Sequence, residues 1–365
     1  MKIKDICNSV TDGSHNPPHG IEHSEYMMLS SKNIYDDEIT FDEPRYLADG
    51  DFQREHKRTN ISEGDVLLTI VGTVGRTAIV DKNMPIFTLQ RSVAVLHPKQ
   101  ELCLGRFLMY ALRGKRTYIE SRAKGVAQKG IYLGEVSDID LKLPDIVEQE
   151  QIIKILDNVC EIIKLRKLEL RSLDNLTKAR FVELFGDPVS NPYGYEKVKL
   201  SELADIKIGP FGSLLHKEDY IEGGHSLINP SHIIDGKVTP DNKLSISDEK
   251  YEELSAYQLK VNDVVMGRRG EMGRCAVVPI EGYLCGTGSI MIRTQGEVTA
   301  DYLQKIISFP SFKKTIEDMA VGQTMPNLNV PIVSAFQIIK PPIEVQNRYY
   351  AFVAQVNKSK VMNVI

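Results

Sequence analysis

A chain of 365 residues exceeds what one ordinary hydrophobic core supports, so two domains or two repeats are expected. Hydrophobic and charged contents of 42% and 26% exclude a disordered or fibrous chain, and no apolar run reaches the length of a membrane span. The net charge of −4 gives no sign of nucleic acid, and five scattered cysteines without a C-x-x-C pair indicate reduced thiols, a cytoplasmic location and no zinc knuckle.

The first distinctive segment is His15-Asn16-Pro17-Pro18-His19-Gly20, which follows an expected short helix. Catalytic loops of adenine-N6 methyltransferases read Asp/Asn/Ser-Pro-Pro-aromatic, and the aromatic ring stacks on the flipped-out base. Here the fourth position is His19, so the segment is expected to be a proline-stiffened, DNA-facing loop and not a catalytic one. The prolines also exclude a helix that would place His15, His19 and His23 on one metal-binding face.

Other catalytic patterns are weak. Asp51-x-x-x-Glu55-x-Lys57 has the residue types of a nuclease site, but it lies in an expected polar loop, LADGDFQREHKRTN, and is interpreted as solvated surface. No phosphate-binding G-x-x-x-x-G-K-[ST] loop is present, and nothing supplies a nucleophile with a supported base. The chain is therefore not expected to be an enzyme or to need a cofactor or metal.

An internal repeat decides the domain organisation. GDVLLTIVGTVGRTAIV, from Gly64, matches NDVVMGRRGEMGRCAVV, from Asn262, at a shift of 198 positions. Pro144-x-Ile146-x-x-Gln149 matches Pro341-x-Ile343-x-x-Gln346 at a shift of 197. Each copy is expected to be mostly β, with strands joined through glycine turns. A helix then follows in each copy, LGRFLMYALRGKRTYIESRAKG and DYLQKIISFPSFKKTIEDMAVG, the second broken or kinked at Pro310.

A long helix is expected from Ile146 to Phe185, where neither proline nor glycine occurs. Apolar residues recur there at steps of four and three, which is typical of a coiled coil of roughly 60 Å. A second helix begins near Ile343 and is apparently incomplete. The seam residues expected between the two antiparallel helices are Ile152, Leu156, Val159, Ile163, Leu170, Leu173, Tyr349, Val353 and Val356. The predicted divisions are a first domain at 1–145, the central helix at 146–186, a second domain at 187–342 and the second helix at 343–365.

In this order, and twice over, these motifs closely resemble the specificity subunit of type I restriction-modification systems, over essentially the whole chain. The resemblance rests on the hairpins, on Gly125-x-x-Gln128-Lys129-Gly130 with Gly322-Gln323-Thr324-Met325-Pro326-Asn327, on the Pro-x-Ile-x-x-Gln helix openings and on LFGDP. It implies an α+β fold with two tandem target-recognition domains separated by long helices that pair as an antiparallel coiled coil. It also implies a non-catalytic subunit that reads a bipartite site in double-stranded DNA and docks two adenine methyltransferase subunits, with endonuclease subunits in full complexes. The short second helix departs from the family pattern.

The residues expected to contact DNA lie in loops and turns, where charged, amide and hydroxyl side chains suit phosphates and base edges. In the first copy they are His15, Asn16, Arg76, Gln90, Arg91, Lys124, Gln128 and Lys129. In the second they are Arg268, Arg269, Arg274, Gln323, Thr324 and Asn327. The segment 106–129, with seven basic residues against the one acid Glu120, is expected to add a DNA-facing surface.

Framework residues agree between the copies and loop residues differ, so the copies are expected to recognise different half-sites. Two alternatives stay open: a fused adenine methyltransferase that uses the HNPPHG loop, and a coiled-coil interaction scaffold that does not bind DNA.

Overall fold

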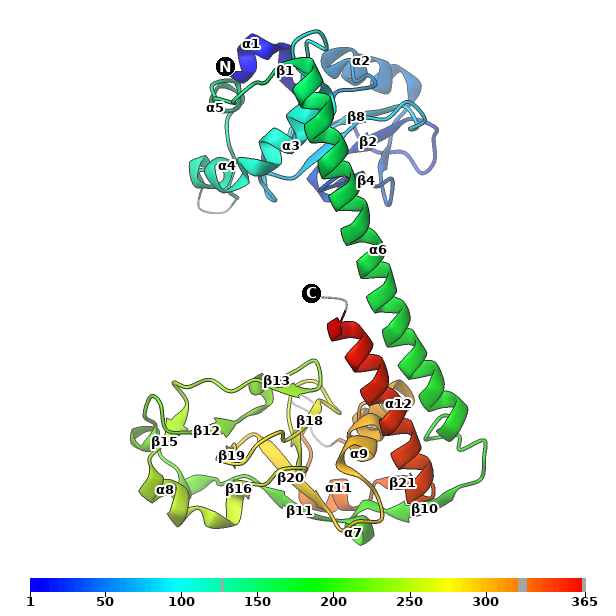
Figure 1. Ribbon diagram of the computed structural model, residues 1–365, viewed down its shortest axis with the longest axis vertical. Helices are drawn as coiled ribbons and strands as arrows, with labels where there is room; N and C mark the ends of the chain where they lie inside the picture. The colour runs from blue at the N-terminus through cyan, green and yellow to red at the C-terminus, as the bar shows by residue number, and fades with distance from the viewer. Residues whose placement is uncertain (126–127, 321–326, 363–365) are drawn as a thin grey trace. The chain divides into compact units, whose positions relative to one another are not determined.

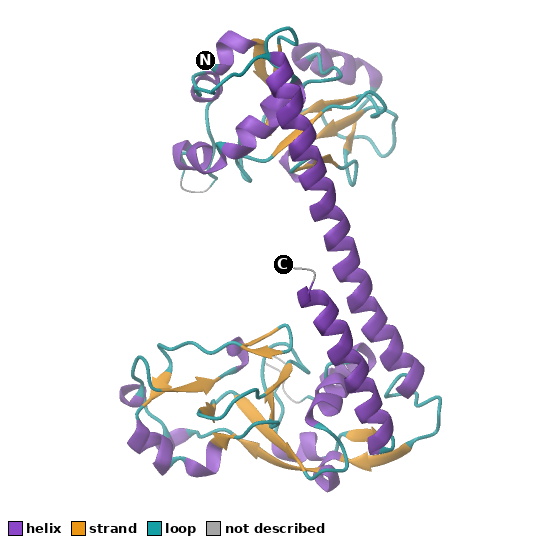
Figure 2. Ribbon diagram, viewed as in Figure 1, coloured by secondary structure: helices purple, strands orange, loops and turns teal. Residues whose placement is uncertain are grey.

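The computed structural model describes residues 1–125, 128–320 and 327–362 of the chain. It separates into two compact units, Met1–Arg166 and Lys167–Ile365, and the division falls inside one long helix. Figure 1 labels the elements of both units, and Figure 2 shows that helix and strand are mixed in each. Among the described helices, none is long and apolar enough to cross a membrane.

The first unit holds nine short strands and the first five helices among its described residues, and α6 begins in it. The strands are β1 (Cys7–Asp12), β2 (Met27–Leu29), β3 (Ile34–Tyr35), β4 (Glu38–Ile39), β5 (Arg45–Tyr46), β6 (Val66–Thr69), β7 (Thr77–Ile79), β8 (Phe87–Leu89) and β9 (Val93–Pro98). The helices are α1 (Ile3–Ile6), α2 (Asp49–Thr59), α3 (Gly105–Gly114), α4 (Arg116–Arg122), α5 (Leu133–Ser137) and α6 (Ile146–Phe185).

The second unit follows a similar order of elements, with three more strands among its described residues. Its strands are β10 (Glu196–Lys199), β11 (Ala204–Ile208), β12 (His225–Ile228), β13 (Ile233–Ile234), β14 (Lys237–Val238), β15 (Ser245–Ile246), β16 (Gln258–Leu259), β17 (Val264–Gly267), β18 (Cys275–Val277), β19 (Tyr283–Cys285), β20 (Ser289–Thr294) and β21 (Gln337–Lys340). Its helices are α7 (Leu200–Leu203), α8 (Asp248–Glu253), α9 (Ala300–Ile307), α10 (Pro310–Met319), α11 (Val330–Ser334) and α12 (Ile343–Met362).

The sheets confirm the tandem repeat and the α+β fold. The central antiparallel sheet has the order β1-β9-β6-β7 in the first unit and β11-β20-β17-β18 in the second. A parallel pair, β2 with β8 and β12 with β19, belongs to a second sheet in each unit. Because both units pair corresponding strands in the same order, their loops occupy corresponding places.

The corner before each central strand explains one repeated motif. Gly64 and Asn262 both have positive φ, 84° and 70°, which favours glycine and tolerates asparagine. The next residues, Asp65 and Asp263, are buried, and each carboxylate accepts a hydrogen bond from the backbone N–H three residues earlier, at 2.7 and 2.8 Å. The Gly/Asn-Asp-Val sequence therefore forms the same corner twice.

The helix that follows the central sheet is divided in both units. In the second unit Pro310 is the first residue of α10, where its missing N–H costs nothing, so the predicted break is confirmed. In the first unit the single predicted helix is wrong, because α3 ends at Gly114 and α4 begins at Arg116. Lys115 between them has φ −97° and ψ 6°, outside the helical range, and glycine just before it weakens helix continuity.

The predicted polar loop around residues 49–59 is also wrong, because this segment forms α2. Phe52 is buried with Met28 and Leu47 in a small core, which gives the helix an apolar anchor. Acidic residues lie in its first turn and basic residues in its last, an arrangement that suits the helix dipole. Asn60 ends it in the left-handed conformation.

A buried glutamine fixes the start of each long helix to its own unit. Gln149 in α6 accepts a hydrogen bond from Leu104 N at 2.9 Å, and Gln346 in α12 accepts one from Thr299 N at 2.9 Å. Each amide group also donates to two backbone carbonyls. The Pro-x-Ile-x-x-Gln motif is therefore an anchor whose side chain satisfies buried backbone groups.

Within the second unit, the C-terminal part of α6 packs against α12 (Figure 1). The rings of Phe181 and Phe185 lie 5.5 and 5.6 Å from that of Tyr349, near the start of α12. Near the end of α12, Lys360 pairs with Asp174, which precedes those phenylalanines in α6. The two helices therefore run antiparallel here.

The predicted seam residues fall into three groups. Leu170, Leu173, Tyr349, Val353 and Val356 are at least half-buried in the second unit, which contains α12. Ile152 and Leu156 are half-buried against the core of the first unit, so their predicted pairing with the second helix is wrong. Val159 and Ile163 are 46% and 48% exposed, so the expected continuous seam is also wrong there. The described part of α12 has 20 residues and spans about 30 Å, whereas the 40 residues of α6 span about 60 Å.

The cysteines are unpaired, and four of them are buried: Cys7, Cys103, Cys275 and Cys285. Burial raises the pKa of each of these thiols to about 12. Because the thiolate is the reactive form, we expect iodoacetamide at pH 8 to alkylate half-buried Cys160 first and the others only after unfolding. Peptide mass spectrometry over a time course checks this order, and early labelling of Cys275 would contradict it.

Candidate nucleic-acid interface

In the first unit, loops from four parts of the sequence meet at one end of the central sheet. Arg91 N donates a hydrogen bond to Ser14 O at 2.9 Å, and Gly72 N donates to Lys129 O at 3.0 Å. The described residues of these loops, here called the first loop cluster, are 13–20, 70–76, 90–92, 123–125 and 128–130.

The second unit brings the corresponding loops together. Arg268 N donates to Gly288 O at 3.0 Å, Leu328 N donates to Arg268 O at 2.9 Å, and Gly209 N donates to Ser289 O at 3.1 Å. The described residues of this second loop cluster are 209–212, 268–274, 286–288 and 327–328. Each unit therefore presents one composite surface built from separate loops.

Close backbone contact requires glycine where each cluster begins. A Cβ at Gly13 would lie 2.1 Å from Leu89 O, and one at Gly209 would lie 2.0 Å from Gly286 O. These distances are far inside van der Waals contact, so any side chain would push the neighbouring turn away. In the first unit the segment after β1 is thus held against the turn before β9. In the second unit the segment after β11 is held in the same way against the turn before β20.

We expect Gly13→Ala to destabilise the first unit by about 1–3 kcal/mol, the usual cost of overpacking. Gly50→Ala is the matched control, because a Cβ there meets nothing within 4 Å and alanine suits the helix better. Thermal unfolding compares the two variants. Equal melting temperatures for both would contradict the close contact.

Of the predicted DNA-contacting residues, four lie side by side in the first loop cluster. His15 and Asn16 are exposed after β1, Arg91 is exposed in the β8–β9 turn, and Gln90 is half-buried beside it. His15 Nε2 is 2.7 Å from Asp12 Oδ2. Arg58 of α2 also reaches this cluster and pairs with Asp12 at 2.9 Å. It is not among the predicted contacts, because its segment was expected to be a loop.

Arg76 and Arg274, the matched framework arginines, both have internal partners. Arg76 Nη1 donates to Ile34 O at 3.4 Å, and its guanidinium lies 5.0 Å from the Tyr35 ring centre. Arg274 Nη1 donates to Pro230 O at 3.3 Å, and the same guanidinium pairs with Glu271 at 2.7 Å. Both arginines tie the hairpin to the segment before it.

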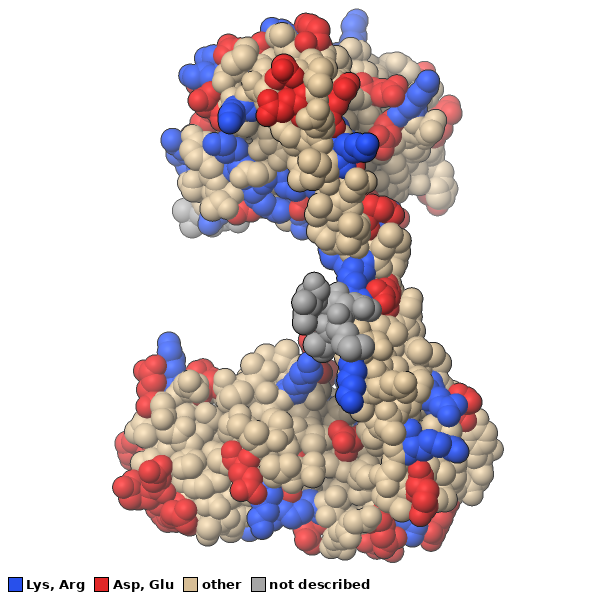
Figure 3. Space-filling view, viewed as in Figure 1, with Lys and Arg blue, Asp and Glu red and all other residues tan. Residues whose placement is uncertain are grey.

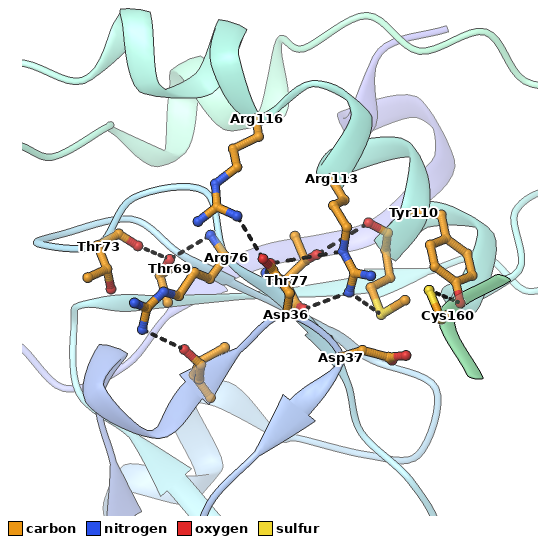
Figure 4. Close-up of polar contacts among 12 residues, drawn as sticks. Asp36, Asp37, Thr69, Thr73, Arg76, Thr77, Tyr110, Arg113, Arg116 and Cys160 are labelled. Carbon is orange, nitrogen blue, oxygen red and sulfur yellow. Dashed lines mark hydrogen bonds and ion pairs between the residues drawn. The ribbon is translucent and has the colours of Figure 1, made fainter. Parts of the chain in front are cut away.

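Most arginines of the segment 106–129 are also occupied. Arg116 pairs with Asp36 at 2.7 Å, and Arg113 lies 3.9 Å from the same carboxylate (Figure 4). Arg106 binds Asp37 at 2.9 Å. Figure 3 shows basic side chains gathered over α3 and α4, but acidic residues some 70 to 80 positions earlier neutralise several of them. The predicted DNA-facing surface is correspondingly reduced.

The loop after α4 is the exposed part of that segment. Gln128 and Lys129 are exposed, and Lys124 is exposed while its ammonium lies 3.3 Å from Glu135. Beside this loop, Gly72, Arg76 and Arg116 help to line a pocket of about 350 Å³ that Lys129 also borders.

The second loop cluster concentrates its positive charge in one turn. Arg268 is half-buried, and its Nε donates to Asn327 Oδ1 at 3.2 Å, while Arg269 is exposed. Within the described residues, neither arginine has a carboxylate within ion-pair distance. The predicted residues Gln323 and Thr324 lie outside the described residues.

Electrostatics distinguish these arginines from their neighbours. Burial, together with the adjacent positive charge of Arg269, lowers the pKa of Arg268 below its usual value. By contrast, hydrogen bonds from Lys313 and Arg274 lower the pKa of the Glu271 carboxyl, so this group stays ionised within its ion pairs. The Arg268–Arg269 turn is therefore a site at which an anion relieves like-charge repulsion.

Comparison with known families agrees with this arrangement. Residues 1–174 and 192–363 each match the family model described as the type I restriction modification DNA specificity domain. The chain belongs to this family.

Named relatives are type I restriction enzyme specificity subunits. The MjaVIII specificity subunit of Methanocaldococcus jannaschii is 22% identical over 325 residues, which cover 82% of this chain and 75% of the relative. The EcoBI specificity subunit of Escherichia coli is 25% identical over 186 residues, covering 49% of this chain and 38% of the relative. The solved S subunit from M. genitalium has the same fold, with a TM-score of 0.58 at 14% identity, covering 99% of this chain and 90% of the other.

Family membership decides between the functions that the sequence left open. The chain is a non-catalytic, DNA-recognition specificity subunit, and neither a methyltransferase nor a scaffold without DNA is favoured. The local structure agrees: a methyltransferase needs a glycine-rich turn between a strand and a helix for S-adenosylmethionine, but Gly72-Thr73-Val74-Gly75 forms a turn between the antiparallel strands β6 and β7. The nuclease-like Asp51 and Glu55 are both paired with Arg54, at 2.7 and 3.5 Å.

Proposed function

We propose that each loop cluster contacts one half of a bipartite site in duplex DNA, in the major groove. The observation that carries this proposal is the repeated geometry: corresponding loops meet at the corresponding end of matched sheets, while their side chains differ. A shared scaffold with different loop residues suits two different half-sites. Base edges in the major groove distinguish all four base pairs, so exposed side chains of this kind suffice for sequence recognition.

The two clusters differ in chemistry. The first offers an imidazole, amides and separate cations, from His15, Asn16, Gln128, Arg91 and Lys129. The second offers two adjacent guanidinium groups with a carboxamide beside them. Arginine pairs best with guanine O6 and N7 or with phosphate, and amides pair with adenine, so the second half-site is expected to contain guanine.

We further propose that α6, which is continuous from one unit into the other, sets the gap between the half-sites and docks the partner subunits. Its exposed apolar residues Ile155, Ile162, Leu165 and Leu168 are 48–65% exposed, which suits burial against another protein. The partners are two adenine methyltransferase subunits and, in full complexes, endonuclease subunits. The proposed recognition domains are 1–145 and 187–342, with helices from 146 and from 343.

Mapping methylated adenines in the source genome, with and without this gene, tests the function directly. A bipartite motif that loses methylation when the gene is removed is the expected result. Unchanged methylation at every motif would contradict the proposal. The same map supplies the target duplex for the binding experiments below.

DNA binding is expected to weaken steeply with salt, because phosphate neutralisation releases counterions. For roughly six neutralised phosphates, affinity should fall by about 10³-fold between about 50 and 200 mM salt. Fluorescence anisotropy of a labelled target duplex measures the slope. A flat salt dependence would show that the basic loop residues do not contact phosphates.

A further inference from the structure

The residue after β11 that corresponds to His15 is Phe211, and its setting is different. Gly13 and Gly209 make the same close contact, so the tetrapeptides Gly-Ser-His-Asn and Gly-Pro-Phe-Gly occupy corresponding places. His15 is held by Asp12, whereas the Phe211 ring is 62% exposed. Every other phenylalanine of the chain is buried or half-buried, so Phe211 alone among them presents its ring to a ligand.

The backbone that leads into Phe211 is constrained on its N-terminal side. Gly209 is packed against the turn before β20, and the ring of Pro210 restricts its own backbone. Gly212 then turns the chain with a φ of 64°. A backbone that is already constrained loses less conformational entropy when its side chain binds.

Phe211 borders a pocket of about 400 Å³ in which apolar groups and cations meet. Its lining residues are Ile208, Phe211, Arg268, Arg269, Thr287 and Gly288. Both arginines lack a carboxylate partner among the described residues, unlike Arg274 and Arg293 of the same unit, which pair with Glu271 and Asp263. The matching ligand therefore carries negative charge or acceptor atoms directly beside a small apolar group.

A thymine next to a guanine or a phosphate meets this description. On the major-groove edges of the base pairs, the thymine C5-methyl is the apolar group, and guanine O6 and N7 are the acceptors that arginine prefers. Phenylalanine and the threonine methyl group are both suited to contact a thymine methyl. An acidic peptide would also meet an arginine pair, but it would not explain why the pocket is formed by the same loops that we assign to DNA.

We propose that Phe211, with Thr287, recognises the C5-methyl group of a thymine in the half-site that the second unit contacts, while Arg268 and Arg269 bind the adjacent guanine or phosphate. This inference rests on the proposed function and names the base feature that the second loop cluster selects. The first loop cluster, with His15 in the corresponding place, has no such selectivity there.

The test replaces thymines one at a time by deoxyuridine, which lacks only the methyl group. The protein is the full chain assembled with its methyltransferase subunits, and the duplex carries the site found by methylation mapping. The half-site of the second unit is identified as the one whose recognition Arg268→Ala/Arg269→Ala impairs. One deoxyuridine in that half should weaken binding by about 4-fold, as expected for one buried methyl group.

The Phe211→Ala variant should bind the thymine and deoxyuridine duplexes with equal affinity, and Phe211→Leu should recover part of the preference. Deoxyuridine in the other half-site is the control. Whatever change in affinity it causes should be the same for the wild-type assembly and for the Phe211 variants. Because Phe211 is exposed, thermal unfolding should be unchanged in the variants, which separates recognition from folding.

Three results would overturn the inference while leaving the proposed function intact. The first is a second half-site without thymine, and the second is a deoxyuridine effect that persists in Phe211→Ala. The third is a wild-type assembly that is insensitive to deoxyuridine anywhere in that half-site; increased fluorescence of a 2-aminopurine in the same half-site would then indicate that the ring is inserted between bases. Failure of the wild-type assembly to prefer the mapped site over random duplex would instead contradict the proposed function.

Discussion

Replacing both Arg268 and Arg269 with alanine is expected to weaken recognition of one half-site by about 30-fold or more, and to leave the other half-site unaffected. Each well-placed arginine contact with a base contributes roughly 1–3 kcal/mol, so two contacts together contribute about 2–6 kcal/mol. The effect is large because these arginines have no carboxylate partner in the described chain that competes for them.

The measurement uses duplexes in which only one half-site is intact. The wild-type assembly and the double variant are titrated with each duplex by fluorescence anisotropy. Lys197→Ala/Lys199→Ala on β10 is the charge-matched control, because it also removes two positive charges from the second unit but lies outside the loop cluster. Equal losses for both half-sites would show that the units do not divide recognition between them.

The largest expected effect on stability is at Phe185. Its side chain is fully buried, with ring centres 4.9 Å from Phe181, 5.0 Å from Tyr302 and 5.6 Å from Tyr349. Phe185→Ala removes this packing between α6, α9 and α12, and should lower the free energy of unfolding of the second unit by about 3–5 kcal/mol.

Phe211→Ala is the matched control, because it makes the same chemical change in the same unit at a ring that is 62% exposed. Urea unfolding should separate the two variants clearly, with a large shift for Phe185→Ala and almost none for Phe211→Ala. DNA binding should show the reverse order once both variants are folded. Similar midpoints for the two variants would mean that the aromatic cluster does not hold α6 and α12 to the unit.

The two units attach to α6 in different ways. In the first unit, Asp157 of α6 accepts hydrogen bonds from Arg106 at 2.8 Å and from the Tyr110 hydroxyl at 2.6 Å. In the second, the corresponding contact is the aromatic cluster around Phe185. The first attachment thus adds polar contacts to the apolar packing of Ile152 and Leu156, whereas aromatic rings dominate the second, although the sheets they support have the same order.

Much of the architecture follows from patterns that repeat in the sequence. The glycine-framed hairpins, the Pro-x-Ile-x-x-Gln openings and the uninterrupted stretch from Ile146 to Phe185 depend on local conformational preferences, and the structure contains each of them. A motif that appears twice at a nearly constant shift is strong evidence, because two copies rarely keep it by chance. The tandem fold and the positions of the candidate loops could therefore be predicted.

Phe211 could also have been found from the sequence. Aligning Gly13 with Gly209, at a shift of 196, places an aromatic residue of the second copy opposite His15. The hairpins match at a shift of 198, which instead places Phe211 opposite Gly13 and hides the correspondence with His15. What the alignment does not provide is that the ring is exposed beside Arg268 and Arg269.

The sequence by itself determined the repeat, the hairpins and the long helices, because these depend on contacts and conformations close along the chain. Only the tertiary structure decided which side chains remain available. Asp36 and Asp37 neutralise arginines about 70 to 80 positions later, Phe52 turns a polar segment into a helix by burying one ring, and Val159 and Ile163 are left uncovered. Each of these outcomes depends on a partner distant in sequence, and burial or ion pairing with such a partner outweighs local preference.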